Sequence, residues 1–216
     1  MLEIRHSSDP WAMLLDRACD IIDAAESAAG TAIDWSFGGG TVLMLRLHHR
    51  LSKDVDVFLP DPQLLGLFSS RIQDAMPERC TGYVESSGAI KLVYDEGEID
   101  FVVSSSLTPA PFENAHVLGR DIVLETCVEI VAKKFWHRGH VATARDLFDL
   151  SAVHDAGVDL SAVAPALRRS GAEFIRQLHE RRDLLEVQFE AIDALDYRES
   201  YDHCLAVAKS LVAGIA

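Results

Sequence analysis

Cysteine is sparse in this 216-residue chain, and none of the four cysteines stands in a C-x-x-C arrangement. That spacing excludes a zinc knuckle and a dense disulfide framework. No apolar run approaches the roughly 20 residues that a bilayer-spanning helix needs. The first residues also lack the charged segment followed by an apolar segment that is typical of a secretion signal. These absences predict a cytoplasmic protein that makes no membrane contact.

Positive charge is also scarce, because 20 lysines and arginines stand against 34 acids and give a net charge of −14. Such a chain repels polyanions, which excludes a protein that coats nucleic acid in general. Two windows, 35–53 and 130–145, nevertheless contain no acid. They indicate either a focused anion site or two cationic helix surfaces. Their cations are Arg46, Arg50 and Lys53 in the first window and Lys133, Lys134, Arg138 and Arg145 in the second.

Three consecutive glycines, Gly38 to Gly40, interrupt an apolar stretch just before Thr41 and a helix-forming segment. Glycine has no Cβ, so it permits positive φ and a close approach to another group. At the start of a helix, unpaired backbone N–H groups and the positive end of the helix dipole favour a phosphate. The segment matches neither the P-loop nor the full dinucleotide fingerprint. It therefore predicts either a phosphate-binding loop or an ordinary turn.

An acid pair follows one short helix later, in the segment Asp54-Val55-Asp56 of an extended apolar run. Side chains alternate across a strand, so both carboxylates project from one face. Two close carboxylates repel each other, and a hard divalent cation such as Mg²⁺ relieves that repulsion. The alternative is a solvated outer face, although Phe58 continues the same face and favours burial. Together, the glycines and the acid pair predict a site for a triphosphate and its magnesium.

A third acid stands on a later strand, which the pattern places at 98–103 after a hairpin turn at 95–97. Glu98 and Asp100 share one face of that strand. If the strands are neighbours, Asp100 lies beside the acid pair and supplies the third carboxylate of a two-metal site. Glu98 is the competing candidate, and a plain surface acid is the remaining alternative.

The periodicity predicts an α+β fold, in which a small mixed β-sheet with flanking helices precedes an α-helical C-terminal domain. Turn residues at Pro109, Pro111 and Gly119 mark the connection between two domains, 1–112 and 113–216. In the first domain we expect helices at 10–29, 41–49 and 62–76, and strands at 32–37, 55–59, 80–85, 89–94 and 98–103.

The pattern of the second domain is helical. A capping box at 126–129 opens its first helix. On that helix Lys134 flanks the apolar face and is the lysine expected inside, whereas Lys133 points outward. In the next helix Arg145 and Asp149 stand four residues apart and can pair on one face.

Four ordered blocks of this sequence resemble one family, the AbiEii/AbiGii-type nucleotidyltransferase toxins. This family is a branch of the polymerase-β-like nucleotidyltransferases that includes the MenT toxins. The resemblance covers most of residues 35–155. The blocks are Gly39-Gly40-Thr41, Arg50-x-Ser52-x-Asp54-x-Asp56, Glu129 to Arg138, and Arg145-Asp146-x-x-Asp149-Leu150. The parent superfamily usually has Gly-Ser in place of Gly40-Thr41, and threonine keeps the hydroxyl.

The resemblance implies the nucleotidyltransferase fold, Mg²⁺ as cofactor and NTP as substrate. The implied metal ligands are Asp54 and Asp56, with Asp100 as a third. The implied nucleotide contacts are Gly39, Gly40 and Thr41, together with Arg50, Ser52 and Lys53. Lys134 looks like the essential lysine of the family, and Asp149 or Asp146 looks like its later acidic residue.

The implied reaction moves an NMP from NTP to an acceptor, which is a tRNA for some relatives. A toxin also implies a cognate antitoxin protein as partner. Two alternatives stay open, namely transfer to a small molecule such as an antibiotic or metabolite, and a catalytically inactive nucleotide-binding module. An enzyme of this kind requires the glycine turn, the acid pair and Lys134 to converge on one cavity.

Overall fold

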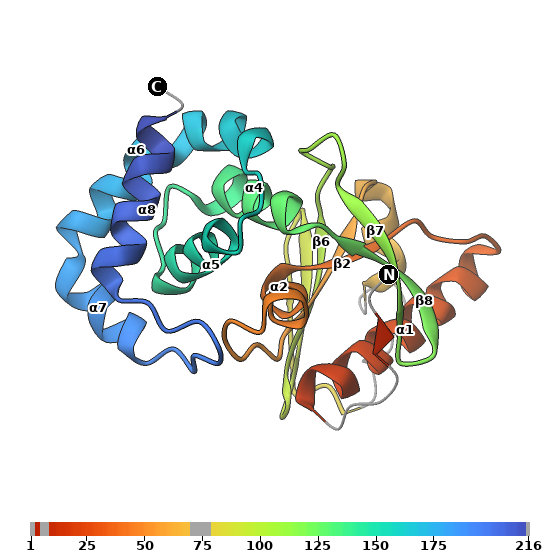
Figure 1. Cartoon of the computed structure of the whole chain (residues 1–216). Helices are drawn as coiled ribbons and strands as arrows, with labels where there is room; N and C mark the ends of the chain where they lie inside the picture. Colours follow the sequence, from red (N-terminus) through yellow and green to blue (C-terminus); the bar gives the residue numbers. More distant parts are fainter. Residues whose placement is uncertain (1–2, 5–8, 70–78, 215–216) are drawn as a thin grey trace. The chain divides into compact units, whose positions relative to one another are not determined.

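The computed structural model describes residues 3–4, 9–69 and 79–214, which form two compact units (Figure 1). None of the helices in these ranges has the length and apolarity that crossing a membrane requires. The first unit comprises Met1–Val42, Ser52–Ser106 and Phe112–Glu125, and the second comprises Leu43–Leu51, Leu107–Pro111 and Thr126–Ala216. The sequence placed a boundary after residue 112, whereas the first unit continues to Glu125.

The first unit is built on a mixed sheet with eight strands in its described part. Their order is β1-β7-β8-β2-β3-β6-β5-β4, and β1 with β7, β2 with β8 and β3 with β6 are the parallel pairs. The predicted α+β class with a mixed sheet is confirmed. The strands are β1 (Glu3–Ile4), β2 (Ser36–Gly38), β3 (Val55–Leu59), β4 (Gly82–Glu85), β5 (Ala89–Tyr94), β6 (Gly97–Val103), β7 (Phe112–Val117) and β8 (Arg120–Glu125).

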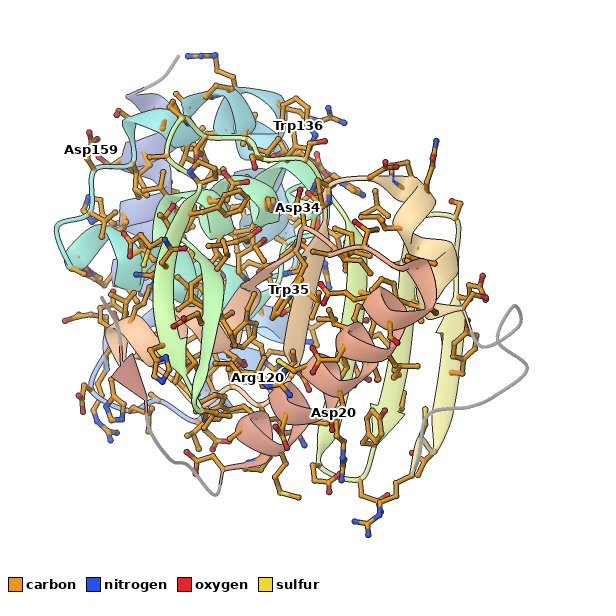
Figure 2. All side chains as sticks on the ribbon, turned by 90° about the vertical axis from the view of Figure 1, so that its right-hand side faces the viewer. Asp20, Asp34, Trp35, Arg120, Trp136 and Asp159 are labelled. Atoms are coloured by element: carbon orange, nitrogen blue, oxygen red, sulfur yellow. The ribbon has the colours of Figure 1, made fainter. Side chains whose placement is uncertain are left out.

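One face of the central strands carries the apolar core of the first unit. Every second residue of β3 and β5 is buried, because side chains alternate across a strand. Helix α1 (Pro10–Ala29) and the 3-10 helix η1 (Pro62–Phe68) pack on the sheet. Arg120 on β8 donates hydrogen bonds to Asp20 and Asp23 of α1, which lies across the strands in Figure 2. The alternate residues of β3 and β5, on the opposite face, are half-buried.

Most elements predicted for the first unit are present with shifted ends. Helix α1 has the predicted bounds, whereas the strand expected at 32–37 is limited to β2. The helix expected at 62–76 corresponds to η1 in its first part, and residues 70–78 lie outside the described residues. Strands β3, β5 and β6 occur where the alternation of the sequence predicted them.

The β7–β8 hairpin was missed, because its turn residues suggested a connection between domains. Leu118 and Gly119 both have positive φ, 52° and 81°, between two antiparallel strands. Two successive positive φ values are typical of a type I′ hairpin turn. The turn signal at Gly119 therefore belongs inside the sheet.

The second unit is helical, as predicted, and several of its helices begin at a side-chain cap. Thr126, Thr143 and Ser200 each accept a hydrogen bond from the backbone N–H three residues later, which satisfies a donor at the helix start. Phe135 and Phe174 pack edge to face between α4 and α6, with ring centroids 4.8 Å apart, and α6 runs beside α8 (Figure 1). The helices are α4 (Cys127–Arg138), α5 (Ala144–Asp155), η2 (Ser161–Val163), α6 (Ala164–Glu180), α7 (Arg182–Glu190) and α8 (Tyr201–Ala213). Helix α2 (Gly39–Leu47) begins in the first unit, and its last residues belong to the second.

Candidate active site

The glycine turn lies where β2 passes directly into α2, and two carboxylates pack against it. Gly39 has a φ of 70°, a conformation that favours glycine. A Cβ at Gly39 would lie 1.8 Å from Oδ2 of Asp56, and a Cβ at Gly38 would lie 2.3 Å from Oε2 of Glu125. Both positions must be glycine if the carboxylates are to keep these places. Glu125 was not predicted, and its register beside β2 is a long-range feature that no local pattern encodes.

Hydrogen bonds of Thr41 connect the first turn of α2 to the segment before β3. The Thr41 hydroxyl donates a hydrogen bond to the carbonyl oxygen of Asp54 at 2.6 Å and lies 3.1 Å from the hydroxyl of Ser52. The Thr41 side chain is fully buried. Thr41 thereby fixes the backbone of an acidic residue, and the phosphate contacts expected of Thr41 and Ser52 stay predictions.

The acid pair projects from the polar face of β3 toward two neighbouring strands. Asp56 is opposite Gly38 on β2 and opposite Asp100 on the parallel strand β6. Asp54 Oδ1 accepts the backbone N–H of Glu98 at 3.1 Å. The sheet therefore brings Asp100 beside the acid pair, as the sequence predicted, and Glu98 contacts the pair through its backbone.

Lys91 on β5 lies among these acidic side chains, next to Asp100 and Glu98. It was not predicted as a site residue from the sequence. Its Nζ lies 2.9 Å from Oδ2 of Asp100 and also binds Glu98. Burial raises the pKa of Asp100, and Lys91 offsets only part of this effect because Glu98 and Asp54 raise the pKa further. Burial lowers the pKa of Lys91, but its two carboxylate partners outweigh burial and raise it. The predicted hairpin turn before β6 sets Lys91 opposite Asp100, so a register count would have found it.

The polar face of the sheet has the donor set that a hard divalent cation requires. Carboxylate oxygens are the ligands that Mg²⁺ prefers. The pKa of Asp100 is raised chiefly by burial, and Glu98 and Asp54 add to the effect. No three His, Cys, Asp or Glu side chains within the described ranges are already arranged to hold a metal ion. Asp54 and Asp56 are the residues that fit such an ion, and Asp100 would join them by exchanging its contact with Lys91.

A second charged cluster is centred on Asp149 of α5, within the second unit. The carboxylate is 0% exposed and accepts hydrogen bonds from Arg50 Nε at 2.6 Å and Arg50 Nη2 at 2.9 Å. His49 Nε2 lies 2.8 Å from Oδ1, and Lys134 Nζ lies 2.9 Å from Oδ2. Burial by itself raises the pKa of Asp149, but Lys134 and Arg50 hold it well below its ordinary value. Asp149 is therefore ionised at neutral pH.

Lys134 of α4 is held between two carboxylates. Its Nζ lies 2.6 Å from Oδ1 of Asp146, which also accepts a hydrogen bond from Arg138 at 3.3 Å. The other oxygen of Asp146 accepts the hydroxyl of Thr143 at 2.8 Å. Burial lowers the pKa of Lys134, yet Asp146 and Asp149 outweigh burial and raise it. Lys134 is thus a fixed ammonium group.

One expectation for a neighbouring side chain is wrong. Lys133 was expected to point outward, but it is only 5% exposed and its Nζ lies 3.8 Å from Oε1 of Glu129. The alternative in which Asp149 pairs with Arg145 does not hold either, because Asp149 is enclosed by other cations while Arg145 is exposed. The expectation that Lys134 is partly buried is confirmed, since its side chain is 10% exposed.

The described fold and the family comparison define the chain as a nucleotidyltransferase. The model of the family described as nucleotidyl transferase AbiEii toxin, type IV toxin–antitoxin system, matches residues 20–211. The chain belongs to this family of nucleotidyltransferase toxins. The resemblance seen in the four sequence blocks is therefore confirmed.

The solved structure of a nucleotidyltransferase toxin has a similar fold. MenT4, a nucleotidyltransferase toxin from Mycobacterium tuberculosis H37Rv, is similar with a TM-score of 0.54 and 21% identity, over 94% of this chain and 83% of that chain. A putative nucleotidyltransferase from H. pylori also matches, with a TM-score of 0.49 and 16% identity over 94% of each chain. No curated protein is a significant match in sequence.

Proposed function

We propose that this chain transfers a nucleoside monophosphate from an NTP to a hydroxyl of an acceptor RNA, with Mg²⁺ held by Asp54 and Asp56. The contact between Asp56 and Gly39 supports this most, because it places a carboxylate of the pair at the start of a helix. A triphosphate and its magnesium need these two features side by side. The ion, when bound, neutralises charge on the triphosphate.

Backbone groups at the start of α2 would bind the phosphates. The first turn of α2 contains no acidic residue, and the leading N–H groups of any helix lack partners within it. They present the positive end of the helix dipole to an anion. Gly39, Gly40 and Thr41 are the proposed contacts, with Ser52 and Lys53 on the connection that follows.

Lys134 would stabilise negative charge on the nucleotide. Asp146 and Asp149 keep its amino group protonated, so Lys134 carries a positive charge and has no lone pair with which to act as a base. The acceptor hydroxyl attacks the α-phosphorus, a P–O bond forms, and the bond to the β-phosphate oxygen breaks so that pyrophosphate leaves. The hydroxyl proton is released to solvent water. Fixed cations and backbone N–H groups favour the charge that develops on the phosphoryl oxygens.

The test is label transfer from each α-³²P-labelled NTP, with Mg²⁺ and total cellular RNA. We expect labelled RNA and free pyrophosphate, and we expect Asp56→Asn to abolish both while circular dichroism is unchanged. Asp34→Asn is the matched control, since Asp34 is an exposed acid of the same unit (labelled in Figure 2). Undiminished transfer by Asp56→Asn would remove Asp56 from the mechanism.

The same reaction separates the alternatives. Label in a low-molecular-weight product instead of RNA would identify a small-molecule acceptor. NTP binding without pyrophosphate release would identify an inactive binding module. The toxin family also implies an antitoxin partner, so we expect growth arrest on expression of the wild-type chain and normal growth with Asp56→Asn.

A further inference from the structure

Arg50 has its guanidinium committed inside the second unit, although the sequence suggested that it contacts phosphate. Nε and Nη2 donate to the two oxygens of Asp149, and Nη1 donates to the carbonyl oxygen of Leu51 at 3.1 Å. The Arg50 side chain is 4% exposed. A two-point arginine–carboxylate pair fixes orientation as well as distance. All three guanidinium nitrogens thus serve a contact within the protein.

Four nitrogen atoms of three residues face Asp149, two at each oxygen. Oδ1 faces Arg50 Nε and His49 Nε2, and Oδ2 faces Arg50 Nη2 and Lys134 Nζ. An ionised carboxylate offers about four acceptor sites, so this one is saturated. Its position is therefore set by Arg50 and His49, and it in turn supplies one of the two carboxylate contacts of Lys134.

The His49 ring also contacts Asp149 and has a defined orientation. A carboxylate can only accept hydrogen bonds, so Nε2 carries the proton that points at Asp149. The other ring nitrogen, Nδ1, is buried and has no hydrogen-bond partner among the described residues. The ring stacks on Phe148, with centroids 6.0 Å apart. Packing and one hydrogen bond therefore hold the imidazole in one orientation.

The backbone around these two residues is also fastened. The N–H of Leu51 donates to the carbonyl oxygen of Asp193 at 2.8 Å, and the N–H of Leu195 donates to that of His49 at 2.9 Å. Arg50 forms an antiparallel bridge with Ala194. The segment that carries Arg50 and His49 thus cannot shift without breaking several hydrogen bonds.

We propose that Arg50 and His49 are positioning residues that hold Asp149, so that Asp149 and Asp146 keep the Lys134 ammonium in one place for the reaction. This rests on the proposed function, in which Lys134 meets the nucleotide. Lys134 is proposed to act on the charge that develops during transfer, and Arg50 and His49 touch no substrate. Loss of either positioning residue therefore lowers kcat and changes NTP affinity little. A phosphate ligand has the opposite signature, since its loss weakens the binding of NTP more than that of NMP.

The experiment compares Arg50→Met, Arg50→Lys and His49→Gln in the full chain by kcat, KM and the Kd values of NTP and NMP. For Arg50→Met we expect kcat to fall about 10- to 100-fold, the size that a misplaced catalytic group causes. The Kd of NTP should stay within about threefold, which is under one kcal/mol. Arg50→Lys should recover part of kcat, because it keeps the charge but loses the two-point contact. Arg168→Met, at an exposed arginine of α6, is the control and should match the wild type.

A weaker affinity for NTP with unchanged kcat at saturation would overturn the proposal, as would a folded Arg50→Met variant with wild-type kinetics. If Arg50→Met fails to fold, Arg50→Lys and His49→Gln carry the same comparison. Acylation of Lys134, measured by mass spectrometry, reports how firmly Asp146 and Asp149 hold the ammonium group, and it requires no turnover. We expect faster acylation in each folded variant than in the wild type. A wild-type chain without transferase activity would refute the proposed function, while unchanged acylation would refute the positioning role separately.

Discussion

Replacement of Gly39 by alanine tests whether the glycine turn exists to admit Asp56. An alanine forced to a φ of 70° costs about 1–2 kcal/mol, because its Cβ meets the backbone. Its Cβ would also lie 1.8 Å from Oδ2 and 2.5 Å from Cγ of Asp56, and such overpacking adds about 1–3 kcal/mol. We therefore expect Gly39→Ala to lower the free energy of unfolding by about 2–5 kcal/mol, the sum of these two ranges.

The control is Gly119→Ala, which separates the two contributions. Gly119 lies in the same unit with a φ of 81°, and an added Cβ there meets no heavy atom within 4 Å. This variant therefore pays only the backbone cost of about 1–2 kcal/mol. Urea denaturation followed by circular dichroism, with the m-value checked for each variant, measures both.

A double-mutant cycle with Asp56→Ala decides the cause. Without the Asp56 carboxylate the two closest contacts of the added Cβ are gone and only the Cβ of residue 56, 3.0 Å away, remains, so the cost of Gly39→Ala should fall toward that of Gly119→Ala. A coupling of about 1–3 kcal/mol is expected, the usual size for residues in contact. An equal cost of Gly39→Ala in both backgrounds would refute the reasoning, and so would a cost no greater than that of Gly119→Ala.

Two further predictions concern buried titratable groups. Asp149→Asn should lower the free energy of unfolding by about 3–5 kcal/mol, because it leaves Arg50 and Lys134 buried with less counter-charge. Since the folded pKa of Asp149 is depressed, its stabilisation is present above the unfolded value of 3.8 and is lost as the pH falls toward the folded pKa. Urea midpoints from pH 6 to pH 3 should thus decline less in Asp149→Asn than in the wild type. Burial raises the pKa of Cys19 from 9.0 to about 11, so its thiolate at pH 8 is about 100-fold scarcer. Mass spectrometry after iodoacetamide treatment should find Cys19 unmodified in the native chain and modified in urea, and rapid native labelling would contradict this.

The alternation of side chains made half of the candidate site predictable. A strand must place residues two apart on one face, so Asp54 and Asp56 had to share the polar side of β3. Asp100 followed from the same rule together with the pairing of neighbouring strands. The β7–β8 hairpin escaped prediction because the first three residues of β7 are exposed, so that the hydrophobic alternation starts only at Ala115. A strand without hydrophobic alternation cannot be distinguished from a loop in the sequence.

The partners of Asp149 were beyond the reach of local rules, and the energies explain why. The pairing of Arg145 with Asp149 at a spacing of four residues is worth about 0.2–0.5 kcal/mol on a helix surface. A carboxylate buried without compensation costs several kcal/mol, so any fold that buries Asp149 must supply partners from wherever the chain allows. In this chain they are Arg50, 99 residues away, and His49, 100 residues away. The Arg145–Asp149 pair is therefore worth less than the buried contacts. The four-residue spacing can indicate that Asp149 is a site residue, but it cannot identify the side chains that hold Asp149.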